Sequence, residues 1–300
     1  MNKNKRDSKK ALLFSLIMPG LGQVYNGEVS KGISLFLIFA FSIPGFSWLA
    51  MHGPNFGLWI LLLLGVFFAL GIYVLSCVDA FKRANVLGEN YQLGPYNKSY
   101  AYLSMLFFGY FFVLNQLVTY TKTSLVELYY VPSVSMSPGL EKGDYFFTDK
   151  NVNSPGCKRN IKRGDIATFV YPNDRTSIYV KRVIGLPGDK IEMSGTDVKV
   201  NGQSLTQSIS PNRQDHQVIR EKADSGETYD VYWKLNSQGT QLSITVPAGQ
   251  VFVLGDNRDE AYDSRKFGTL PLTDVIGVAK QVWFSLADAG FRIGRWVDVN

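Results

Sequence analysis

Two serine hydroxyls offer chemistry that needs no cofactor. Ser133 and Ser135 lie between Pro132 and Pro138, which restrict the backbone to extended or turn geometry. Because residues i and i+2 of an extended chain face the same side, both hydroxyls can point at one spot. One could attack an acyl group while the other donates a hydrogen bond to the resulting oxyanion. Taken alone, the segment is equally well explained as an ordinary Ser/Pro-rich loop.

A lysine supplies the base that such a serine would need. Lys181 lies within the apolar run Ile178–Ile184, which predicts a strand. Strand alternation places Lys181 and Arg182 on opposite faces, so one of the two cations must leave the solvent face or lie at an edge. Burial would lower the pKa of the Lys181 amine from about 10.4, and a neutral amine could take a proton from a serine. The alternative is that both side chains extend to water.

A third segment, Gly255–Arg265, carries charges of both signs and follows the predicted strand Val251–Leu254. We expect its ion pairs to brace an active site rather than to perform the chemistry. The residues predicted to give this structural support are Asp256, Arg258, Asp263, Ser264 and Arg265.

Metal ligands and paired cysteines are scarce. The two histidines, His52 and His216, are far apart in the sequence, and neither C-x-x-C nor H-E-x-x-H occurs. Cys77 lies in an apolar segment and Cys157 in a polar loop, so we predict no disulfide. The sequence therefore predicts a reaction without a metal or a cofactor.

Composition divides the chain into two parts. The 300 residues are 46% hydrophobic and 19% charged, which excludes a disordered chain. Residues 1–121 carry 9 Lys or Arg and 4 Asp or Glu, a net charge of +5, whereas residues 122–300 carry 22 and 21, a net charge of +1. The excess positive charge thus accompanies the apolar part, where it orients membrane segments, and we predict no nucleic-acid binding.

Three apolar stretches within residues 1–121 have the length of about 20 residues that a membrane-spanning helix needs. They contain no Lys, Arg, Asp or Glu, and they cover residues 32–51, 56–78 and 99–121. The apolar run Ala11–Met18 is too short to span, because Pro19 and Gly20 stop it. We therefore predict a membrane module of about three helices, preceded by an interfacial helix.

Basic residues predict the orientation of this module. They cluster before the first span and in the loop Asp79–Lys98, whereas the loop His52–Asn55 contains no Lys or Arg. By the positive-inside rule, the N-terminus is cytoplasmic and three spans carry residues 122–300 to the other side. If Ala11–Tyr25 also crossed the membrane, the globular part would instead be cytoplasmic.

The glycine-rich run Pro19–Gly27, followed by Lys31 and Gly32, resembles a segment that opens paired-helix modules in some small bacterial membrane proteins. That resemblance implies no chemistry. The simpler interpretation is a Gly-rich turn at the level of the lipid headgroups.

Residues 122–300 have a different pattern. Short runs rich in β-branched and aromatic residues alternate with turns that contain Gly, Pro, Asn or Asp. We expect a mostly antiparallel β domain with little helix. The predicted strands are Tyr145–Thr148, Ile166–Val170, Ile178–Ile184, Val198–Val200, Leu242–Val246 and Val251–Leu254.

These motifs, in this order, are similar to those of the signal peptidase I (leader peptidase) family. The matching segments are Pro132–Met136, Arg163–Ile166, Tyr179–Asp189, Gly255–Arg265 and Trp283–Ser285. Members are membrane-anchored serine proteases with a Ser/Lys dyad. The resemblance implies a membrane-anchored, mainly β protein: an N-terminal helical transmembrane module, residues 1–121, followed by an antiparallel β catalytic domain, residues 122–300.

The resemblance also implies a role for each matching residue. Ser135 becomes the nucleophile and Lys181 the general base. Ser133 and the Ser135 N–H become the oxyanion hole, and Met136 shapes the substrate pocket. Asp263 and Arg265 match a structural ion pair. The aromatic residues expected at the lipid surface are Trp283, Phe284, Phe291 and Trp296.

By this resemblance the protein is a serine endopeptidase that removes signal peptides from secretory preproteins. It would cleave after small residues, in an Ala-x-Ala pattern, at the outer face of the bacterial cytoplasmic (inner) membrane. The implied partners are preproteins, the lipid bilayer and the export machinery.

Two positions depart from the family pattern. Many members have Thr where this chain has Gly139, and Ser where it has Ala261. The Ser of those members hydrogen-bonds the catalytic lysine, so Ser264, Tyr262 or a water would have to replace it here. One alternative is therefore a catalytically impaired homologue that binds signal peptides or acts as a scaffold. Two others are a self-cleaving regulator, for which no DNA-binding domain is visible, and a purely structural membrane-tethered β module.

Overall fold

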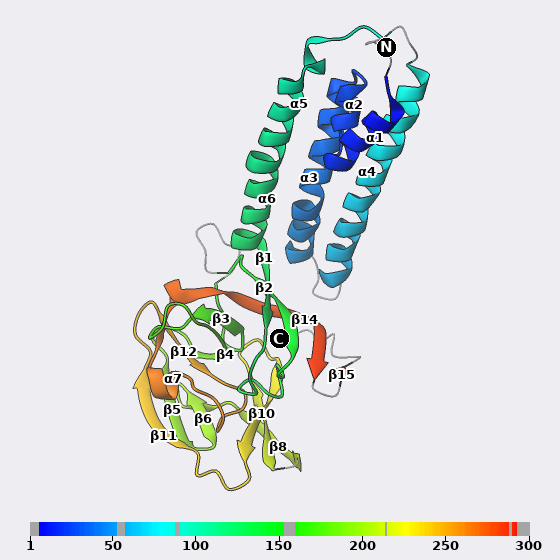
Figure 1. Ribbon diagram of the computed structural model, residues 1–300. Coiled ribbons are helices and arrows are strands. Elements are labelled where there is room, and N and C mark those ends of the chain that lie inside the picture. The colour runs from blue at the N-terminus through cyan, green and yellow to red at the C-terminus, as the bar shows by residue number, and fades with distance from the viewer. Residues whose placement is uncertain are drawn as a thin grey trace. The chain divides into compact units, whose positions relative to one another are not determined.

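The computed structural model describes residues 6–52, 58–87, 91–152, 160–213, 215–287 and 290–292, and it divides into two compact units (Figure 1). Unit 1 is Met1–Leu125 and unit 2 is Val126–Asn300. Cys157, Trp296 and residues 53–55 of the first short loop lie outside the described residues, as does the side chain of Phe291.

Unit 1 is helical. Its helices are α1 (Ser8–Ile17), α2 (Leu21–Tyr25), α3 (Val29–His52), α4 (Leu58–Val86), η2 (Pro95–Asn97), α5 (Ser99–Leu106), η3 (Phe107–Leu114), α6 (Asn115–Tyr120) and η4 (Thr121–Leu125). Among the described residues, three helical stretches are long and apolar enough to cross a membrane, namely Val29–Ala50, Ile60–Val86 and Ser99–Leu125. In Figure 1, α3 and α4 run side by side.

Helix α4 continues to Val86, well beyond the end predicted at Val78. The charged residues after Val78 do not end the helix because contacts hold its polar end. Asp79 accepts hydrogen bonds from Gln23 Nε2 at 3.0 Å and from Lys31 Nζ at 2.7 Å. The start of the predicted loop Asp79–Lys98 is therefore helical.

The run Pro19–Gly27 is more than a turn, which corrects the simpler interpretation of the sequence. It contains helix α2, all five residues of which are buried. Its polar groups bond to α4: the Gly20 N–H donates to Ser76 Oγ at 2.8 Å, and Asn26 Nδ2 donates to the Ala80 carbonyl at 2.8 Å. The small residues of this run thus allow α2 to pack closely against α4.

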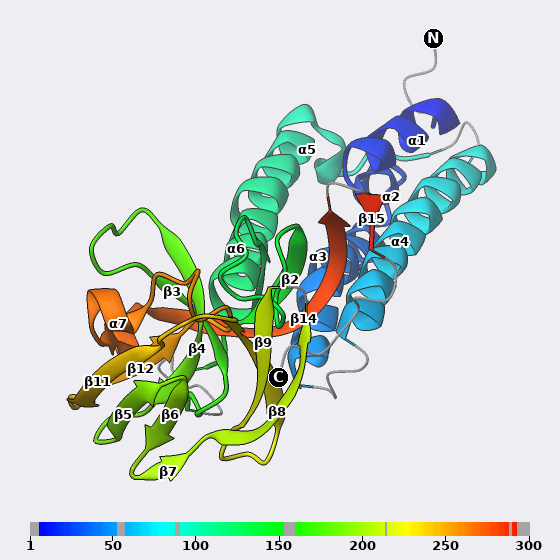
Figure 2. The same ribbon diagram turned by 90° about the horizontal axis from the view of Figure 1, so that it is seen from below.

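Unit 2 is built from three antiparallel sheets, which confirms the predicted β domain (Figure 2). Eight strands form the largest sheet in the order β1-β2-β14-β3-β4-β12-β13, with β15 paired to β14. Its strands are β1 (Val126–Tyr130), β2 (Asp144–Asp149), β3 (Ile166–Val170), β4 (Ile178–Gly185), β12 (Gln250–Leu254), β13 (Leu270–Pro271), β14 (Val275–Ala287) and β15 (Gly290–Phe291).

Two smaller sheets complete unit 2. One has the order β10-β9-β8 and the other β11-β5-β6-β7. Their strands are β5 (Lys190–Gly195), β6 (Asp197–Val200), β7 (Gln203–Ser204), β8 (Thr206–Arg213), β9 (His216–Lys222), β10 (Thr228–Lys234) and β11 (Thr240–Thr245). Helical structure among the described residues of unit 2 is limited to α7 (Ser264–Phe267) and the 3-10 turn η5 (Leu272–Asp274).

The position of β4 in the largest sheet fixes the position of Lys181. Strand β4 pairs with β3 on one side, where Lys181 faces Ala167, and with β12 on the other, where Arg182 faces Leu254. Apolar residues fill one face behind these strands, including Phe169, Val183 and Val253. Since each such buried side chain contributes about 1.5–3 kcal/mol, this packing resists a slip of the strand register.

Candidate active site

The structure brings the lysine and both predicted serines together. Lys181 Nζ donates a hydrogen bond to Ser135 Oγ at 3.0 Å and a second one to the Val180 carbonyl at 2.8 Å. Ser133 Oγ lies 3.2 Å from Ser135 Oγ. The three groups come from the loop after β1 and from β4, so residues 46 apart in the sequence form one cluster.

Both cations on β4 are buried. Lys181 is 4% exposed and Arg182 is 2% exposed, so the alternative in which both side chains extend to water is wrong. Burial lowers the pKa of the Lys181 amine to about 8, although the carboxylates of Asp263 and Asp256 oppose this decrease. An amine with this pKa is neutral in a useful fraction of molecules near neutral pH and can accept a proton.

Arg182 points away from Lys181 into a buried ion pair. Its Nε and Nη2 atoms donate to Oδ1 and Oδ2 of Asp256 at 2.8 and 2.7 Å. Burial alone would lower the pKa of the Arg182 guanidinium, but the Asp256 carboxylate more than offsets this effect, so the pKa is raised and Arg182 stays charged. This pair also accounts for Gly139, because a Cβ atom there would lie 2.5 Å from Asp256 Oδ2. A glycine is needed where the loop of the serines passes the carboxylate.

The predicted pair of Asp263 and Arg265 is present. Arg265 Nε and Nη2 donate to the two carboxylate oxygens of Asp263 at 2.8 and 2.7 Å. Asp263 Oδ2 also accepts a hydrogen bond from the Gly255 N–H at 3.0 Å, and Asp263 caps α7. Ser264 Oγ accepts from the Val253 N–H at 3.0 Å, so its hydroxyl supports β12 and does not replace the missing hydroxyl at Ala261.

Arg258 has a partner that the sequence analysis missed. Its Nη1 and Nη2 atoms bond to Oε1 and Oε2 of Glu221 at 2.7 and 2.6 Å, and both side chains are fully buried. Glu221 lies on β9, within the charged run Arg220–Lys222, which reads as a solvated surface. The alternation of side chains along a strand could have predicted the burial of Glu221, because this residue lies on the same face as the buried Ile219.

A cavity of about 570 Å³ opens at the cluster. Ser133, Ser135 and Lys181 line it together with residues from the end of β1 and the start of β4. Apolar side chains such as Phe146 form much of its wall. Met136 is not among the lining residues: it is fully buried in the cluster that also contains Phe146, behind the wall that it was predicted to form.

In the part of the chain that the structure describes, no three His, Cys, Asp or Glu side chains come together as a metal site. Cys77 is a free, buried thiol in α4. His216 lies on β9, where its ring stacks on that of Tyr232 with centroids 5.2 Å apart. Neither side chain contacts the serine cluster through a described interaction.

Comparison with known proteins decides the family. The family model described as "Signal peptidase, peptidase S26" matches residues 104–284, more than half of the chain. The chain belongs to this family. The match covers the segments on which the resemblance was based up to residue 284, which lies within the last of them, Trp283–Ser285, and the resemblance is thereby confirmed.

Individual members of the signal peptidase family are similar over most of their length. Signal peptidase I of Pseudomonas fluorescens is 30% identical over 58% of this chain and 70% of its own. Signal peptidase I P of Bacillus subtilis subsp. natto is 36% identical over 57% of this chain and 83% of its own. A crystal structure of a signal peptidase I from Enterococcus faecalis V583 is 31% identical and covers 40% of this chain and 96% of that one, with a TM-score of 0.27.

We predict that the buried pair of Arg258 and Glu221 is essential for the stability of this signal peptidase. Glu221→Gln should lower the free energy of unfolding by about 3–5 kcal/mol, because it leaves a buried guanidinium without its counter-charge. The control is Asp230→Asn, which breaks the exposed pair of Arg220 and Asp230 in the same hairpin and should change the melting temperature far less. Equal melting temperatures for the two variants would contradict the prediction.

Proposed function

We propose that this chain is a signal peptidase I in which Ser135 is the nucleophile and Lys181 the general base. The observation that carries the proposal is the 3.0 Å hydrogen bond between the buried Lys181 amine and the Ser135 hydroxyl. Nucleophile and base are already within the distance that proton transfer requires. Membership of the signal peptidase family supplies the reaction class, hydrolysis of a peptide bond.

The reaction follows from the positions of the three groups. Neutral Lys181 takes the proton of Ser135, whose oxygen attacks the carbonyl carbon of the scissile bond. Ser133 Oγ, 3.2 Å from the nucleophile, and the Ser135 N–H donate to the resulting oxyanion, a contribution of about 2.7–4 kcal/mol for each donor. Lys181 then protonates the leaving amine. A water that gives its proton to the same lysine hydrolyses the acyl-enzyme.

The cavity beside Ser135 supports a preference for small residues on the signal-peptide side. It lies between two backbone segments, the end of β1 and the start of β4, to which an extended peptide can add as a strand. Alternate side chains of that peptide face the same wall. Phe146 and Val180 line this wall, and their bulk favours small residues such as Ala at the first and third positions before the cleaved bond.

The helices of unit 1 support a multi-pass location in the bacterial cytoplasmic membrane. Three apolar helices have the required length, whereas α1 ends at Ile17 after ten residues. With the basic N-terminus inside, three crossings bring unit 2 to the extracytoplasmic side, where exported preproteins emerge. The partners of the enzyme would then be preproteins, the lipid bilayer and the export machinery.

An impaired homologue that binds signal peptides is the second candidate, and Ala261 is the observation that favours it. Ala261 is buried next to Gly255, whose backbone also approaches the Lys181 side chain, and it offers no hydroxyl to the amine. In this chain the Val180 carbonyl accepts a hydrogen bond from Lys181 instead. The amine therefore remains directed at Ser135 without a serine at position 261.

The dyad is tested by Ser135→Ala and Lys181→Met in the full-length protein reconstituted in phospholipid vesicles. Each variant should cleave a preprotein more than about 1000-fold more slowly than the parent protein, because nucleophile and base act as one unit. Ser194→Ala and Lys190→Met, which change residues outside the cavity, are the controls and should cleave normally. Normal cleavage by Lys181→Met would refute the assignment of the base.

The pH dependence tests the state of the amine. Because the pKa of Lys181 is lowered to about 8, the base is protonated and inactive below that pH and becomes neutral above it. The value of kcat/KM for a preprotein peptide should therefore rise with pH, and the midpoint of this rise should lie at about pH 8. A midpoint near 10.5, the ordinary value for a lysine, would contradict a desolvated base.

Ala261→Ser distinguishes the active enzyme from the impaired homologue. If Val180 already orients the amine, the added hydroxyl should change kcat/KM by less than about threefold. If the parent protein is inactive and Ala261→Ser cleaves preproteins, the second candidate is correct. The measurement is cleavage of one purified preprotein by both proteins at equal concentration.

A further inference from the structure

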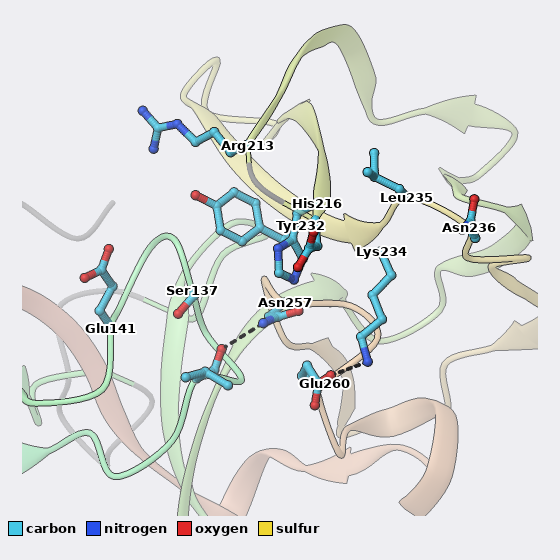
Figure 3. Close-up of a pocket in the computed structure, with 12 residues that line it drawn as sticks. Ser137, Glu141, Arg213, His216, Tyr232, Lys234, Leu235, Asn236, Asn257 and Glu260 are labelled. Carbon is cyan, nitrogen blue, oxygen red and sulfur yellow. Dashed lines mark hydrogen bonds and ion pairs between the residues drawn. The ribbon is translucent and has the colours of Figure 1, made fainter.

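A second and larger cavity, of about 1020 Å³, borders the loop that carries the serines (Figure 3). Val134 lines this cavity, whereas its neighbours Ser133 and Ser135 line the first one. The loop thus separates the two cavities. Glu260 lines both of them, so the two cavities meet at this residue.

The far wall of the second cavity is the three-stranded sheet β10-β9-β8. The stacked rings of His216 and Tyr232 form part of this wall, and Leu235 follows them at the end of β10. In Figure 3, Ser137 lies on the opposite side of the Tyr232 ring from Leu235, and Asn257 lies beside this wall, where it forms a β-bridge with Tyr232. The volume of this cavity is that of the larger ligand-binding pockets in proteins, which span about 300–1,000 Å³.

Charges of both signs line this cavity, and Arg213 and Asp215 contribute one of each. Lys234 forms an ion pair with Glu260, and Glu141 forms one with Arg292. The lining therefore offers polar contacts but no strong field of one sign. Such a lining accepts side chains of different charge, and it leaves recognition to groups that bind the peptide backbone.

Asn257 presents one such group. Its N–H donates to the Ser135 carbonyl at 3.1 Å, and its Nδ2 atom donates to the Val134 carbonyl at 3.3 Å. The residue is 4% exposed, and among the described residues its Oδ1 atom accepts no hydrogen bond. In Figure 3 the side chain lies between the loop of Ser137 and the residues Tyr232 and Lys234. A buried acceptor without a donor is costly, and a peptide N–H would satisfy it.

We propose that the second cavity binds the mature side of the preprotein, the residues that follow the scissile bond, and that Asn257 Oδ1 accepts one of their backbone N–H groups. The inference rests on the proposed function. A peptide whose signal-peptide side occupies the first cavity, and whose scissile carbonyl lies at Ser135, must continue past Glu260. The second cavity borders this point. The mature ends of secretory proteins differ in sequence, so recognition through the backbone and a neutral lining fits them.

The first test compares two substrates that share the signal-peptide side and carry either one or about ten residues after the cleaved bond. The parent protein should prefer the long substrate. Leu235→Trp narrows the cavity from its far wall and should reduce the ratio of kcat/KM for the long substrate to that for the short one about tenfold. The matched control is Ile209→Trp, an exposed aliphatic residue on β8 outside the cavity, which should leave the ratio as it is. An equal ratio in Leu235→Trp and in the parent protein would overturn the proposal.

A second set of substrates tests Asn257 through the peptide backbone. Long substrates are N-methylated singly at the second, third or fourth amide after the scissile bond, so that each lacks one N–H. Methylation at one of these positions should lower kcat/KM about tenfold, whereas methylation at either of the other two should lower kcat/KM less. Equal rates for all three substrates would refute the assignment of Oδ1.

Photocrosslinking separates the failure of this inference from the failure of the proposed function. The full-length Ser135→Ala protein is incubated with the long substrate, which carries benzoylphenylalanine at its third mature residue. Adducts on Tyr232 or Leu235 would support the second cavity as a peptide site, even if the parent protein cleaved no preprotein and the proposed function therefore failed. Normal cleavage by the parent protein with adducts only elsewhere would refute the cavity and leave the peptidase intact.

Discussion

The chemistry proposed for unit 2 depends on an amine that the fold shields from water. A lysine on an exposed strand stays protonated at neutral pH, whereas Lys181 is buried at the centre of the largest sheet, between β3 and β12. Desolvation makes the neutral form accessible, and the contact with Ser135 gives that form a proton to accept. The sheet thus supplies the free energy that converts an ordinary side chain into a base.

Buried carboxylates limit the decrease in the pKa of Lys181. Each one near the amine favours its protonated form, yet the loop after β12 contains two, Asp256 and Asp263. They are committed to arginines: Asp256 binds Arg182, and Asp263 binds Arg265. In these pairs a guanidinium group balances the negative charge of each carboxylate. The pairs also hold the loop against the serine segment. The same network therefore fixes the geometry while the pKa of Lys181 stays lowered, so that the neutral amine remains accessible.

The sequence was sufficient for the parts that follow from local patterns. Strand β3 and the apolar run around Lys181 were predicted because β-branched residues and turn residues mark them, and the spacing of Ser133 and Ser135 predicted their proximity. Contacts between residues that lie far apart in the sequence were not predictable. The partner of Arg258 comes from another sheet, and the burial of Met136 depends on which face of its loop meets the core. In unit 1, α2 is buried because α4 accepts its polar groups, a contact that no local pattern encodes.

The adjacent cations of β4 have a consequence for when the enzyme becomes active. Since they face opposite sides of the strand, a displacement of β4 by one position would exchange the amine for a permanently charged guanidinium beside the hydroxyl. By the proposed mechanism, hydrolytic competence is then a property of the folded sheet. A newly made chain carries both proposed reactive residues but gains the contact between the Lys181 amine and the Ser135 hydroxyl only when this sheet has formed.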